Sequence, residues 1–262
     1  MTTTTETQPS ETSASQSAPT APAETTQRAT SARRTTPALT HVEPRPLLDP
    51  IRQVKRHSIH WKRKVFHVLG VGTAALTYAL TTVTQSTALM ILGGIAAVFV
   101  TLDLLRFKVP ALNKIVKRDF GPYMRDYELD GISGSSWFFF SGLIVIALFS
   151  KEAAALGMLY LAIGDPIASA VGVKFGRIKL PGGKSLEGSL ALTLICCVAG
   201  SLLLGLRFGY TPVAAFGVAT LTAVAAAFAE WLPLNKKMDD NFTVPLISSA
   251  AAAGAMLLAG VV

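Results

Sequence analysis

The sequence predicts an all-α, polytopic membrane protein with about seven transmembrane helices and a cytoplasmic N-terminus. Three observations lead to this fold class. Half of the 262 residues are hydrophobic, they gather in runs near the ~20 residues that cross a bilayer, and basic residues cluster in alternate loops between these runs. A net charge of +8 with only 15% charged residues suits a membrane protein better than a soluble basic one, so we expect no nucleic-acid partner.

The chain divides into two regions. Residues 1 to about 46 are rich in Thr, Ser, Pro, Ala and Gln and nearly lack large aliphatic residues, a composition typical of disorder. We therefore expect a disordered cytoplasmic tail over 1–46 and a membrane-embedded domain over 47–262. The tail contains no apolar core followed by a small-residue cleavage site, so it predicts no signal peptide.

Apolar runs of near-spanning length fill the second region, and the third run is the shortest. We place the predicted spans at about 65–83, 86–105, 135–150, 153–173, 188–206, 211–229 and 243–261. Two further segments, 47–61 and 109–118, are amphipathic and are expected to lie at the inner membrane interface.

Lys and Arg are distributed unevenly between the loops. They cluster before the first span and after the second, fourth and sixth spans, whereas the opposite side holds only Lys151 and Arg207. By the positive-inside rule the N-terminus is cytoplasmic and, with seven spans, the C-terminus lies outside. We expect a multi-pass protein of a bacterial inner membrane or an equivalent membrane.

Asp165 is the most informative single residue, because it is an acid in the cytoplasmic half of the fourth predicted span. An ionisable residue within a span costs a few kcal/mol to insert and marks a functional site by default. No cation lies one turn earlier, so a purely structural acid would need a partner from another span. Small residues follow at helical spacing, and Gly172 and Gly176 would permit close helix packing.

Polar groups from four separate segments reach the same predicted membrane boundary. The candidates for catalysis are Asp165, Lys64 and Arg63. The candidates for nucleotide or phosphate binding are Lys184, Ser185, Gly183, Gly172 and Lys174. The candidates for metal binding are Asp165, Glu187, Asp240, Asp239 and Glu230, and the further candidates are His67 and Asn241.

These residue types suggest phosphoryl transfer. Mg²⁺ takes one or two protein carboxylates together with the phosphate oxygens of a nucleoside triphosphate, and Lys184, Arg63 and Lys64 would bind the nonbridging oxygens. Backbone N–H groups of the 182–185 loop would add an anion-binding nest. The acceptor would be a lipid alcohol that enters laterally, and Asp165 would act on its hydroxyl or bind the metal; the residues leave both roles open. Arg63 and Lys64 are also compatible with simple interfacial anchoring.

Motifs in four regions point to a family. They are Arg63-Lys64-x-x-His67, Gly164-Asp165-x-x-Ala168-Ser169-x-x-Gly172, Lys184-Ser185-Leu186-Glu187-Gly188-Ser189, and the late pair Glu230-x-x-Pro233 and Asp239-Asp240-Asn241-x-x-x-Pro245. In this order they resemble motifs of the dolichol kinase, CTP-dependent diacylglycerol kinase and phytol kinase group. The resemblance spans roughly residues 60 to 250.

The resemblance implies an integral membrane kinase that transfers the γ-phosphate of a nucleoside triphosphate to a polyprenol, a phytol-like alcohol or diacylglycerol. CTP is the donor that the resemblance suggests, and the residues leave the choice between CTP and ATP open. It also implies that Arg63, Lys64, Asp165 and Gly172 are important positions. The chain lacks the long extra membrane region of many dolichol kinases, and its late segment is most similar to phytol kinases.

Two alternatives remain at this stage. Phosphatidate cytidylyltransferases are similar in their Asp…Gly…Lys-Ser-x-Glu-Gly region, but their late K-R-x-x-x-x-K-D…P-G-H-G-G loop is missing from this sequence. A membrane transporter would use Asp165 as a proton or cation relay. Transport predicts polar residues in both membrane halves, whereas the outer halves of the predicted spans lack them.

Overall fold

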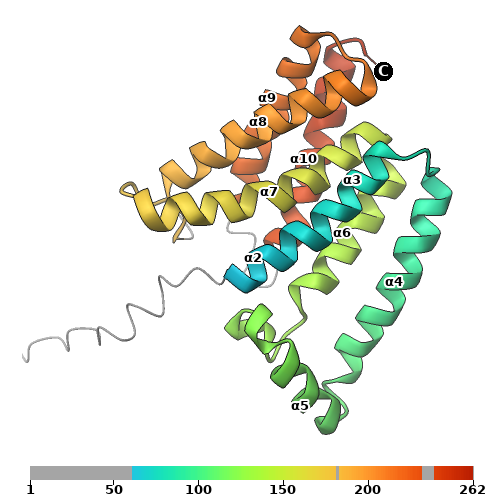
Figure 1. The fold of residues 1–262 in the computed structure, drawn as a ribbon, viewed down its shortest axis with the longest axis vertical. Helices are drawn as coiled ribbons and strands as arrows, with labels where there is room; N and C mark the ends of the chain where they lie inside the picture. The colour runs from blue at the N-terminus through green and yellow to red at the C-terminus, as the bar shows by residue number, and fades with distance from the viewer. Residues whose placement is uncertain (1–60, 181–182, 232–238, 262) are drawn as a thin grey trace, which may run out of the picture. The chain divides into compact units, whose positions relative to one another are not determined.

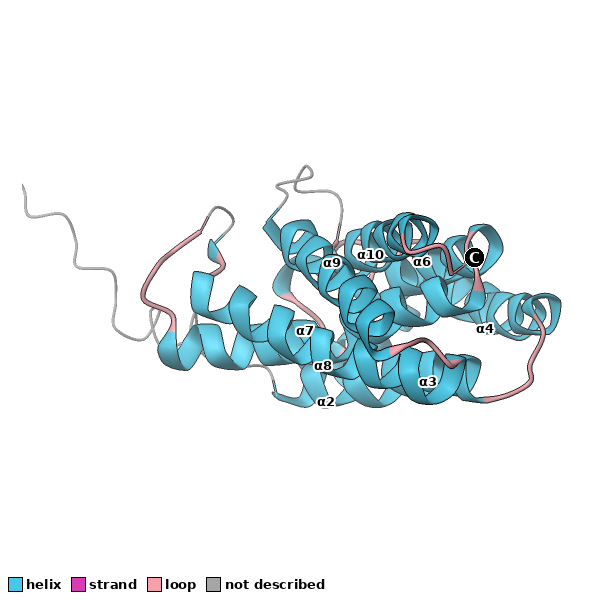
Figure 2. Cartoon of the chain, turned by 90° about the horizontal axis from the view of Figure 1, so that it is seen from above, coloured by secondary structure: helices cyan, strands magenta, loops and turns pink. Residues whose placement is uncertain are grey.

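The computed structural model describes residues 61–180, 183–231 and 239–261. The predicted tail 1–46 and nearly all of the amphipathic segment 47–61 lie outside the described residues. Within the described part the regular elements are helices (Figure 2), apart from one isolated bridge between Lys179 and Ser185. The structure therefore confirms the predicted all-α class.

The helices follow one another with short connections. In chain order they are α2 (Trp61–His67), α3 (Thr73–Leu80), α4 (Gln85–Leu105), α5 (Pro110–Asp119), α6 (Gly134–Leu148), α7 (Lys151–Phe175), α8 (Leu186–Phe208), α9 (Pro212–Trp231) and α10 (Asp240–Leu258). A π-helical turn, η1 (Val68–Gly72), joins α2 to α3, and two 3₁₀ turns, η2 (Gly121–Tyr123) and η3 (Asp126–Glu128), lie between α5 and α6.

Five helices in the described part, α4, α7, α8, α9 and α10, are long and apolar enough to cross a membrane by length and composition. They coincide with five of the predicted spans and make the chain a multi-pass integral membrane protein. Large apolar side chains such as Leu206, Val213 and Leu258 are exposed on them, as expected for surfaces that face lipid. Seven spans remain a prediction, because α6 has 15 residues and the first run is divided among α2, η1 and α3.

Helix α7 lies at the centre of the bundle (Figure 1). It packs against η1 and α3, against α6, and against α8, α9 and α10, and every residue from Ala153 to Ala162 is buried. Helix α4, by contrast, packs chiefly against α6. The central position of α7 carries Asp165 into the interior of the bundle.

The last helix begins earlier than the predicted 243. A carboxylate oxygen of Asp239 accepts a hydrogen bond from the backbone N–H of Asn241 at 2.9 Å, and α10 starts at Asp240. An Asp at this capping position satisfies a free N–H of the first turn, so Pro245 lies inside the helix and not in its first turn. Asp239 and Asp240 are thereby fixed at the N-terminus of α10.

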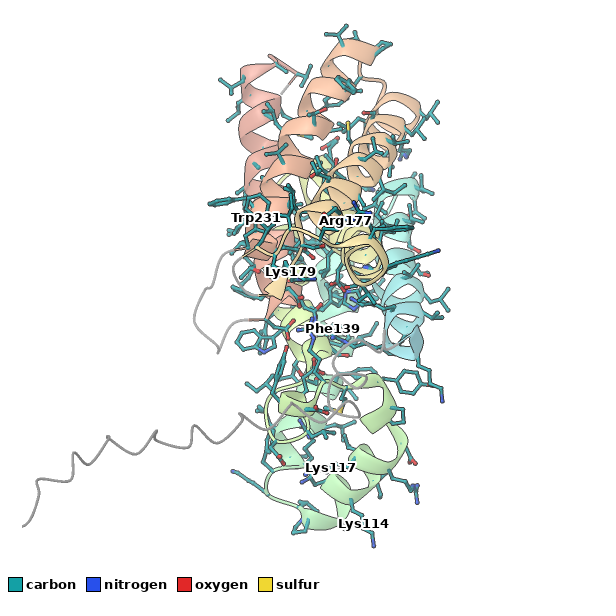
Figure 3. All side chains as sticks on the ribbon, turned by 90° about the vertical axis from the view of Figure 1, so that its left-hand side faces the viewer. Lys114, Lys117, Phe139, Arg177, Lys179 and Trp231 are labelled. Carbon is teal, nitrogen blue, oxygen red and sulfur yellow. The ribbon has the colours of Figure 1, made fainter. Side chains whose placement is uncertain are left out.

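The predicted amphipathic segment 109–118 forms α5, which begins with Pro110. None of its residues is buried, and Lys114 projects outward (Figure 3). A helix that packs this little against the bundle suits the predicted place at the membrane interface.

Candidate active site

Asp165 has a partner from another segment, as a buried acid requires. The Lys64 ammonium on α2 forms an ion pair with the Asp165 carboxylate, and Nζ lies 3.5 Å from the Asp165 carbonyl oxygen. The two side chains are only 10% and 7% exposed. Because each charge neutralises the other, the pair explains how α7 tolerates a buried acid.

Lys184 lies just before α8 and is held by acids from two later helices. Its Nζ is 3.1 Å from Glu230 Oε1 on α9 and 3.8 Å from Asp240 Oδ2 at the start of α10. Burial alone would lower the pKa of Lys184, but the carboxylates of Glu230, Asp240 and Asp165 raise that pKa above its ordinary value. Lys184 is therefore a permanent cation.

Arg125, between η2 and η3, binds both acids at the start of α10. Its guanidinium donates to the two carboxylate oxygens of Asp240 at 3.0 and 2.7 Å and to Asp239 Oδ2 at 3.1 Å. The Tyr127 hydroxyl donates to the same Asp239 oxygen at 2.8 Å. Burial, followed by the neighbouring Asp240 carboxylate, raises the pKa of Asp239 to about 7.

The Lys64–Asp165 pair and the ion pairs of Lys184 and Arg125 form one group, because Asp165 is among the carboxylates that act on Lys184. We call this group the charged cluster. Its members are the cations Lys64, Arg125 and Lys184 and the carboxylates Asp165, Glu230, Asp239 and Asp240. They come from six segments of the chain, and ion pairs hold each cation in place. A preorganised set of cations is suited to binding the oxygens of a polyphosphate.

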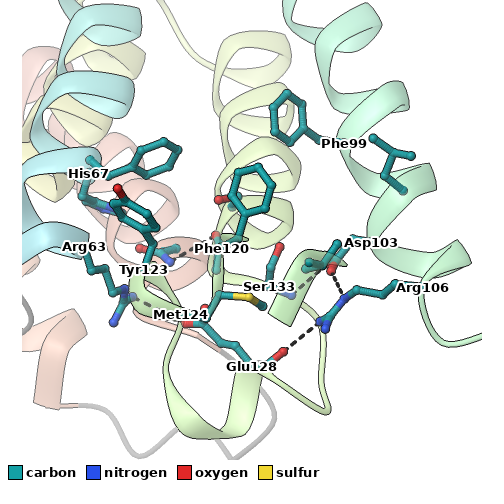
Figure 4. A pocket seen from close by; sticks show the side chains of 16 residues that line it. Arg63, His67, Phe99, Asp103, Arg106, Phe120, Tyr123, Met124, Glu128 and Ser133 are labelled. Carbon is teal, nitrogen blue, oxygen red and sulfur yellow. Dashed lines mark hydrogen bonds and ion pairs between the residues drawn. The ribbon is translucent and has the colours of Figure 1, made fainter. Parts of the chain in front are cut away.

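Arg63 and His67 lie four residues apart on α2 and line a cavity beside the charged cluster (Figure 4). Arg63 Nη2 is 3.7 Å from Glu128 Oε1, and both side chains are buried. Asn241 also lines this cavity, and its side-chain amide donates to the Gly134 carbonyl at 3.1 Å. The structure thus brings three sequence candidates, Arg63, His67 and Asn241, to a second wall of the site.

A buried pair at the C-terminal end of α4 fixes the segment that carries Arg125 and Glu128. Arg106 Nε lies 2.7 Å from Asp103 Oδ1, and its guanidinium donates to the carbonyls of Glu128 and Leu129 at 2.8 and 3.0 Å. Every polar group of this arginine side chain thus has a partner, as a buried charge requires. The pair thereby holds in place the segment around Glu128, which lines the cavity opposite α2.

The loop before α8 positions Lys184 through close packing. The Ser185 hydroxyl accepts a hydrogen bond from the Gly188 N–H at 3.2 Å and so caps α8. A Cβ added to Gly172 on α7 would lie 2.8 Å from that hydroxyl oxygen, which is too close for an ordinary contact. Gly172 therefore allows α7 to approach the loop and, through Ser185, sets the place of Lys184.

The structure does not bring Gly183, Glu187 and Lys174 into the charged cluster. The N–H of Gly183 donates to the Leu180 carbonyl at 3.2 Å within the turn, and Gly182 lies outside the described residues. Glu187 accepts two backbone N–H groups of the segment after α7, at 2.9 and 3.2 Å. Lys174 is exposed, with its Nζ 5.1 Å from the centroid of the neighbouring Phe ring.

Two carboxylates fit a magnesium ion that arrives with a nucleotide. Within residues 61–180, 183–231 and 239–261 no group of three His, Cys, Asp or Glu side chains could hold a metal ion by itself. Mg²⁺ needs only one or two protein carboxylates when phosphate oxygens complete its shell. Glu230 Oε2 is buried without a hydrogen-bond partner in this part of the chain. The other carboxylate, Asp240, lies near the same Lys184 ammonium as Glu230.

Sequence reasoning missed three residues of the site, Arg125, Tyr127 and Glu128. It counted Arg125 only as a topology charge, because charged residues between two helices are usually solvated. The available signal was weak: two acids and one arginine lie within four residues, in a loop on the predicted catalytic side.

Comparisons with known proteins agree with the motifs. CTP-dependent diacylglycerol kinase 1 of Schizosaccharomyces pombe is 31% identical over 158 residues, which cover 56% of this chain and 71% of that protein. The phytol kinase of Synechocystis sp. is 31% identical over 176 residues, covering 64% and 70%. CTP-dependent diacylglycerol kinase 1 of Saccharomyces cerevisiae is 27% identical over 218 residues, covering 75% and 72%.

No family model and no solved structure matches the chain, so the relationship is one of sequence. Two of these relatives share more than 30% of aligned residues over at least 70% of their own length. The chain therefore belongs to the family of CTP-dependent diacylglycerol kinases and phytol kinases.

Proposed function

We propose that this protein is a membrane kinase that transfers the γ-phosphate of CTP to a lipid alcohol. The observation that carries the proposal is the charged cluster, in which three cations are held by four carboxylates at one place in an otherwise apolar bundle. The names of the relatives supply the donor, CTP, and two acceptors, diacylglycerol and phytol. The motif resemblance adds a polyprenol as a third acceptor.

The cations would bind the phosphate groups of the nucleotide. Lys64 on α2 and Lys184 before α8 are each held by a carboxylate, and Arg63 lies one residue before Lys64. In the reaction the acceptor oxygen forms a bond to the γ-phosphorus, the bond to the β,γ-bridging oxygen breaks, and the hydroxyl loses its proton. Cations fixed beside these oxygens stabilise the charge that develops on them.

Asp165 would act mainly on Lys64. The sequence offers this acid as a base or as a metal ligand, but its carboxylate is already engaged by the Lys64 ammonium. A buried ammonium without a partner would lose its charge or its place. Asp165 therefore serves best to keep Lys64 charged and aimed at the phosphates.

Glu230 and Asp240 would hold Mg²⁺, because both lie close to the Lys184 ammonium and Glu230 Oε2 has no hydrogen-bond partner among the described residues. When bound, the ion would neutralise charge on the β- and γ-phosphates. Asp239 is the less suitable donor, since Arg125, Tyr127 and a backbone N–H already occupy its oxygens.

We place the charged cluster on the cytoplasmic side of the membrane. The loops that contribute Arg125 and Lys184 belong to the Lys/Arg-rich set, which stays cytoplasmic by the positive-inside rule. CTP is a soluble, highly charged molecule of the cytoplasm and would reach the site from there.

The test uses purified protein in detergent with CTP or ATP that carries a label either in the γ-phosphate or in the base. The acceptors are diacylglycerol, phytol, a polyprenol and, for the cytidylyltransferase alternative, phosphatidate. We expect γ-label in the lipid and CDP as the second product. Base label in the lipid together with pyrophosphate release would identify nucleotidyl transfer and overturn the proposal.

Two variants control the assay. Lys64→Gln removes a cation of the charged cluster and should abolish transfer. Lys117→Gln breaks an exposed ion pair between α5 and Asp130, whose side chains are 39% and 83% exposed, and should leave transfer intact.

A further inference from the structure

The cavity beside the charged cluster has a volume of about 150 Å³. It lies between α2, α4, α5, the η2 turn and the N-terminal ends of α6 and α10. Its wall is mostly apolar, and aromatic side chains make up much of it: Phe66, Phe99, Phe120 and Tyr123 (Figure 4). Each of these four side chains is partly exposed, so the ring-lined part of the cavity is open at the protein surface. Phe99 lies on α4, a helix that is long and apolar enough to cross a membrane.

The inner end of the cavity is polar and incompletely satisfied. His67 is only 9% exposed and Glu128 only 2%, and both line the cavity. His67 Nε2 and Glu128 Oε1 are buried without a hydrogen-bond partner in the described part of the chain; Glu128 Oε1 has only the Arg63 guanidinium, at 3.7 Å. Buried polar atoms normally have partners, so two free atoms at the end of an apolar cavity indicate a ligand with one polar end.

The polar end also adjoins the reaction centre. Arg63 and Lys64 are neighbours on α2; the first lines the cavity and the second pairs with Asp165. His67 lies one helical turn after Arg63 and Lys64 on α2, so the three side chains can share one face of the helix. A group bound at His67 would therefore be beside the phosphates that the charged cluster holds.

We propose that this cavity binds the hydroxyl-bearing end of a single-chain lipid alcohol, whose O–H donates a hydrogen bond to His67 Nε2. This inference rests on the proposed kinase function. As the oxygen bonds to the γ-phosphorus and the nucleoside diphosphate leaves, the hydroxyl proton passes to Nε2, which leaves Asp165 free to hold Lys64. Beyond its first carbons, the hydrocarbon chain of the alcohol would pass between the aromatic rings and out of the cavity.

The size of the cavity favours one chain over two. A cavity of about 150 Å³ lined by apolar side chains accepts benzene, which is close in size to a branched five-carbon unit. The head of diacylglycerol carries two ester groups beside its hydroxymethyl carbon, and the ring-lined wall would have to accommodate their oxygens. A single-chain alcohol such as phytol places its one oxygen at the polar end and only carbon against the rings.

Neighbouring residues of α5 provide a matched pair of variants. Val116 lines the cavity, whereas Ile115 is exposed. Val116→Phe fills the cavity with a ring, and Ile115→Phe adds the same bulk to an outward-facing position. The assay measures kcat/KM for phytol, the KM for CTP and, without nucleotide, cross-linking of a photoreactive phytol analogue.

We expect Val116→Phe to lower kcat/KM for phytol at least about tenfold and to reduce cross-linking, because an overfilled cavity excludes its ligand. Ile115→Phe should match the unsubstituted protein, and the KM for CTP should be unchanged in both. His67→Gln keeps a hydrogen-bonding group and should mainly lower kcat, by about 10²-fold or more, since an amide cannot take the proton. His67→Phe should also raise the KM for phytol.

The outcomes separate this inference from the proposed function. Absence of transfer from any nucleotide, with cross-linking still blocked by Val116→Phe, would remove the kinase function and keep the alcohol site. Normal transfer with unchanged phytol kinetics in Val116→Phe and His67→Gln would overturn the site. Competition by dioleoylglycerol equal to that by phytol would overturn the single-chain assignment. If His67→Phe fails to fold, the kcat/KM for phytol and the cross-linking of Val116→Phe test the site instead.

Discussion

The replacement Asp165→Asn tests the central contact of the charged cluster. It removes the carboxylate but keeps the shape of the side chain, and it leaves the Lys64 ammonium buried without its partner. The exposed fractions of 10% and 7% put this pair in the buried class, for which loss of one partner costs about 3–5 kcal/mol. At about 2–4 °C per kcal/mol for a domain of this size, the Tm should fall by roughly 6–20 °C.

A double variant separates stability from catalysis. Lys64→Gln with Asp165→Asn leaves no unpaired charge, so most of the lost Tm should return. Transfer to lipid should nevertheless stay at least about 100-fold below that of the unsubstituted protein, because the cation that faces the phosphates is gone. The measurements are thermal unfolding in detergent and turnover with CTP.

The exposed Lys117–Asp130 pair is the control. Its Nζ–Oδ1 distance is 2.8 Å, a normal ion-pair contact, but an exposed pair contributes only about 0–1 kcal/mol. Lys117→Gln should therefore leave both the Tm and turnover close to their original values. An Asp165→Asn protein with an unchanged Tm and normal turnover would refute the reasoning, since neither the pair nor the site would then depend on this acid.

Three further predictions concern packing, metal and topology. Gly172→Ala puts a methyl group 2.8 Å from the Ser185 hydroxyl oxygen and should lower turnover about tenfold or more through displacement of the loop, whereas Gly217→Ala, with open space around it, should not change turnover. A chelator should stop turnover without changing the Tm of the nucleotide-free protein, because Mg²⁺ would bind with the nucleotide; a lower Tm would indicate a resident metal. Since the two native cysteines are buried, a cysteine at Lys114 or Lys179 should react with an impermeant maleimide from the cytoplasmic side only.

The long helices could be predicted because their signal is local. Five apolar runs fixed five of the helices to within a few residues, as length and hydropathy alone determine a membrane span. The last span was predicted from 243, whereas the capping carboxylate of Asp239 makes α10 begin three residues earlier, at Asp240. Local patterns thus located the helices, whereas the start of α10 depends on a side-chain capping contact.

The site could be predicted only in part, because pairing depends on tertiary structure. The charge asymmetry of the loops grouped Lys64, Asp165 and Lys184 on one side of the membrane, and the structure does bring them together. It did not reveal which cation meets which acid. Glu187 was predicted as a metal ligand, but it accepts backbone N–H groups close by in the chain, and Arg125 resembled an ordinary loop residue.

The ion pair between Lys64 and Asp165 also has a consequence for how the protein is made. The two residues are 101 positions apart, so at about 5–20 residues per second the ribosome completes Asp165 roughly 5–20 s after Lys64. A lysine without a partner is costly to bury in a membrane, so α2 should remain at the interface during this interval.

The first segment would then take its final depth only after α7 has been inserted. Asp239 and Asp240 emerge later still. Without them, the described residues leave Arg125 without an ion-pair partner and Lys184 with Glu230 as its one ion-pair partner. Biogenesis of the nucleotide site is thus tied to insertion of the last helix, and a nascent chain that stops before α10 carries no complete site.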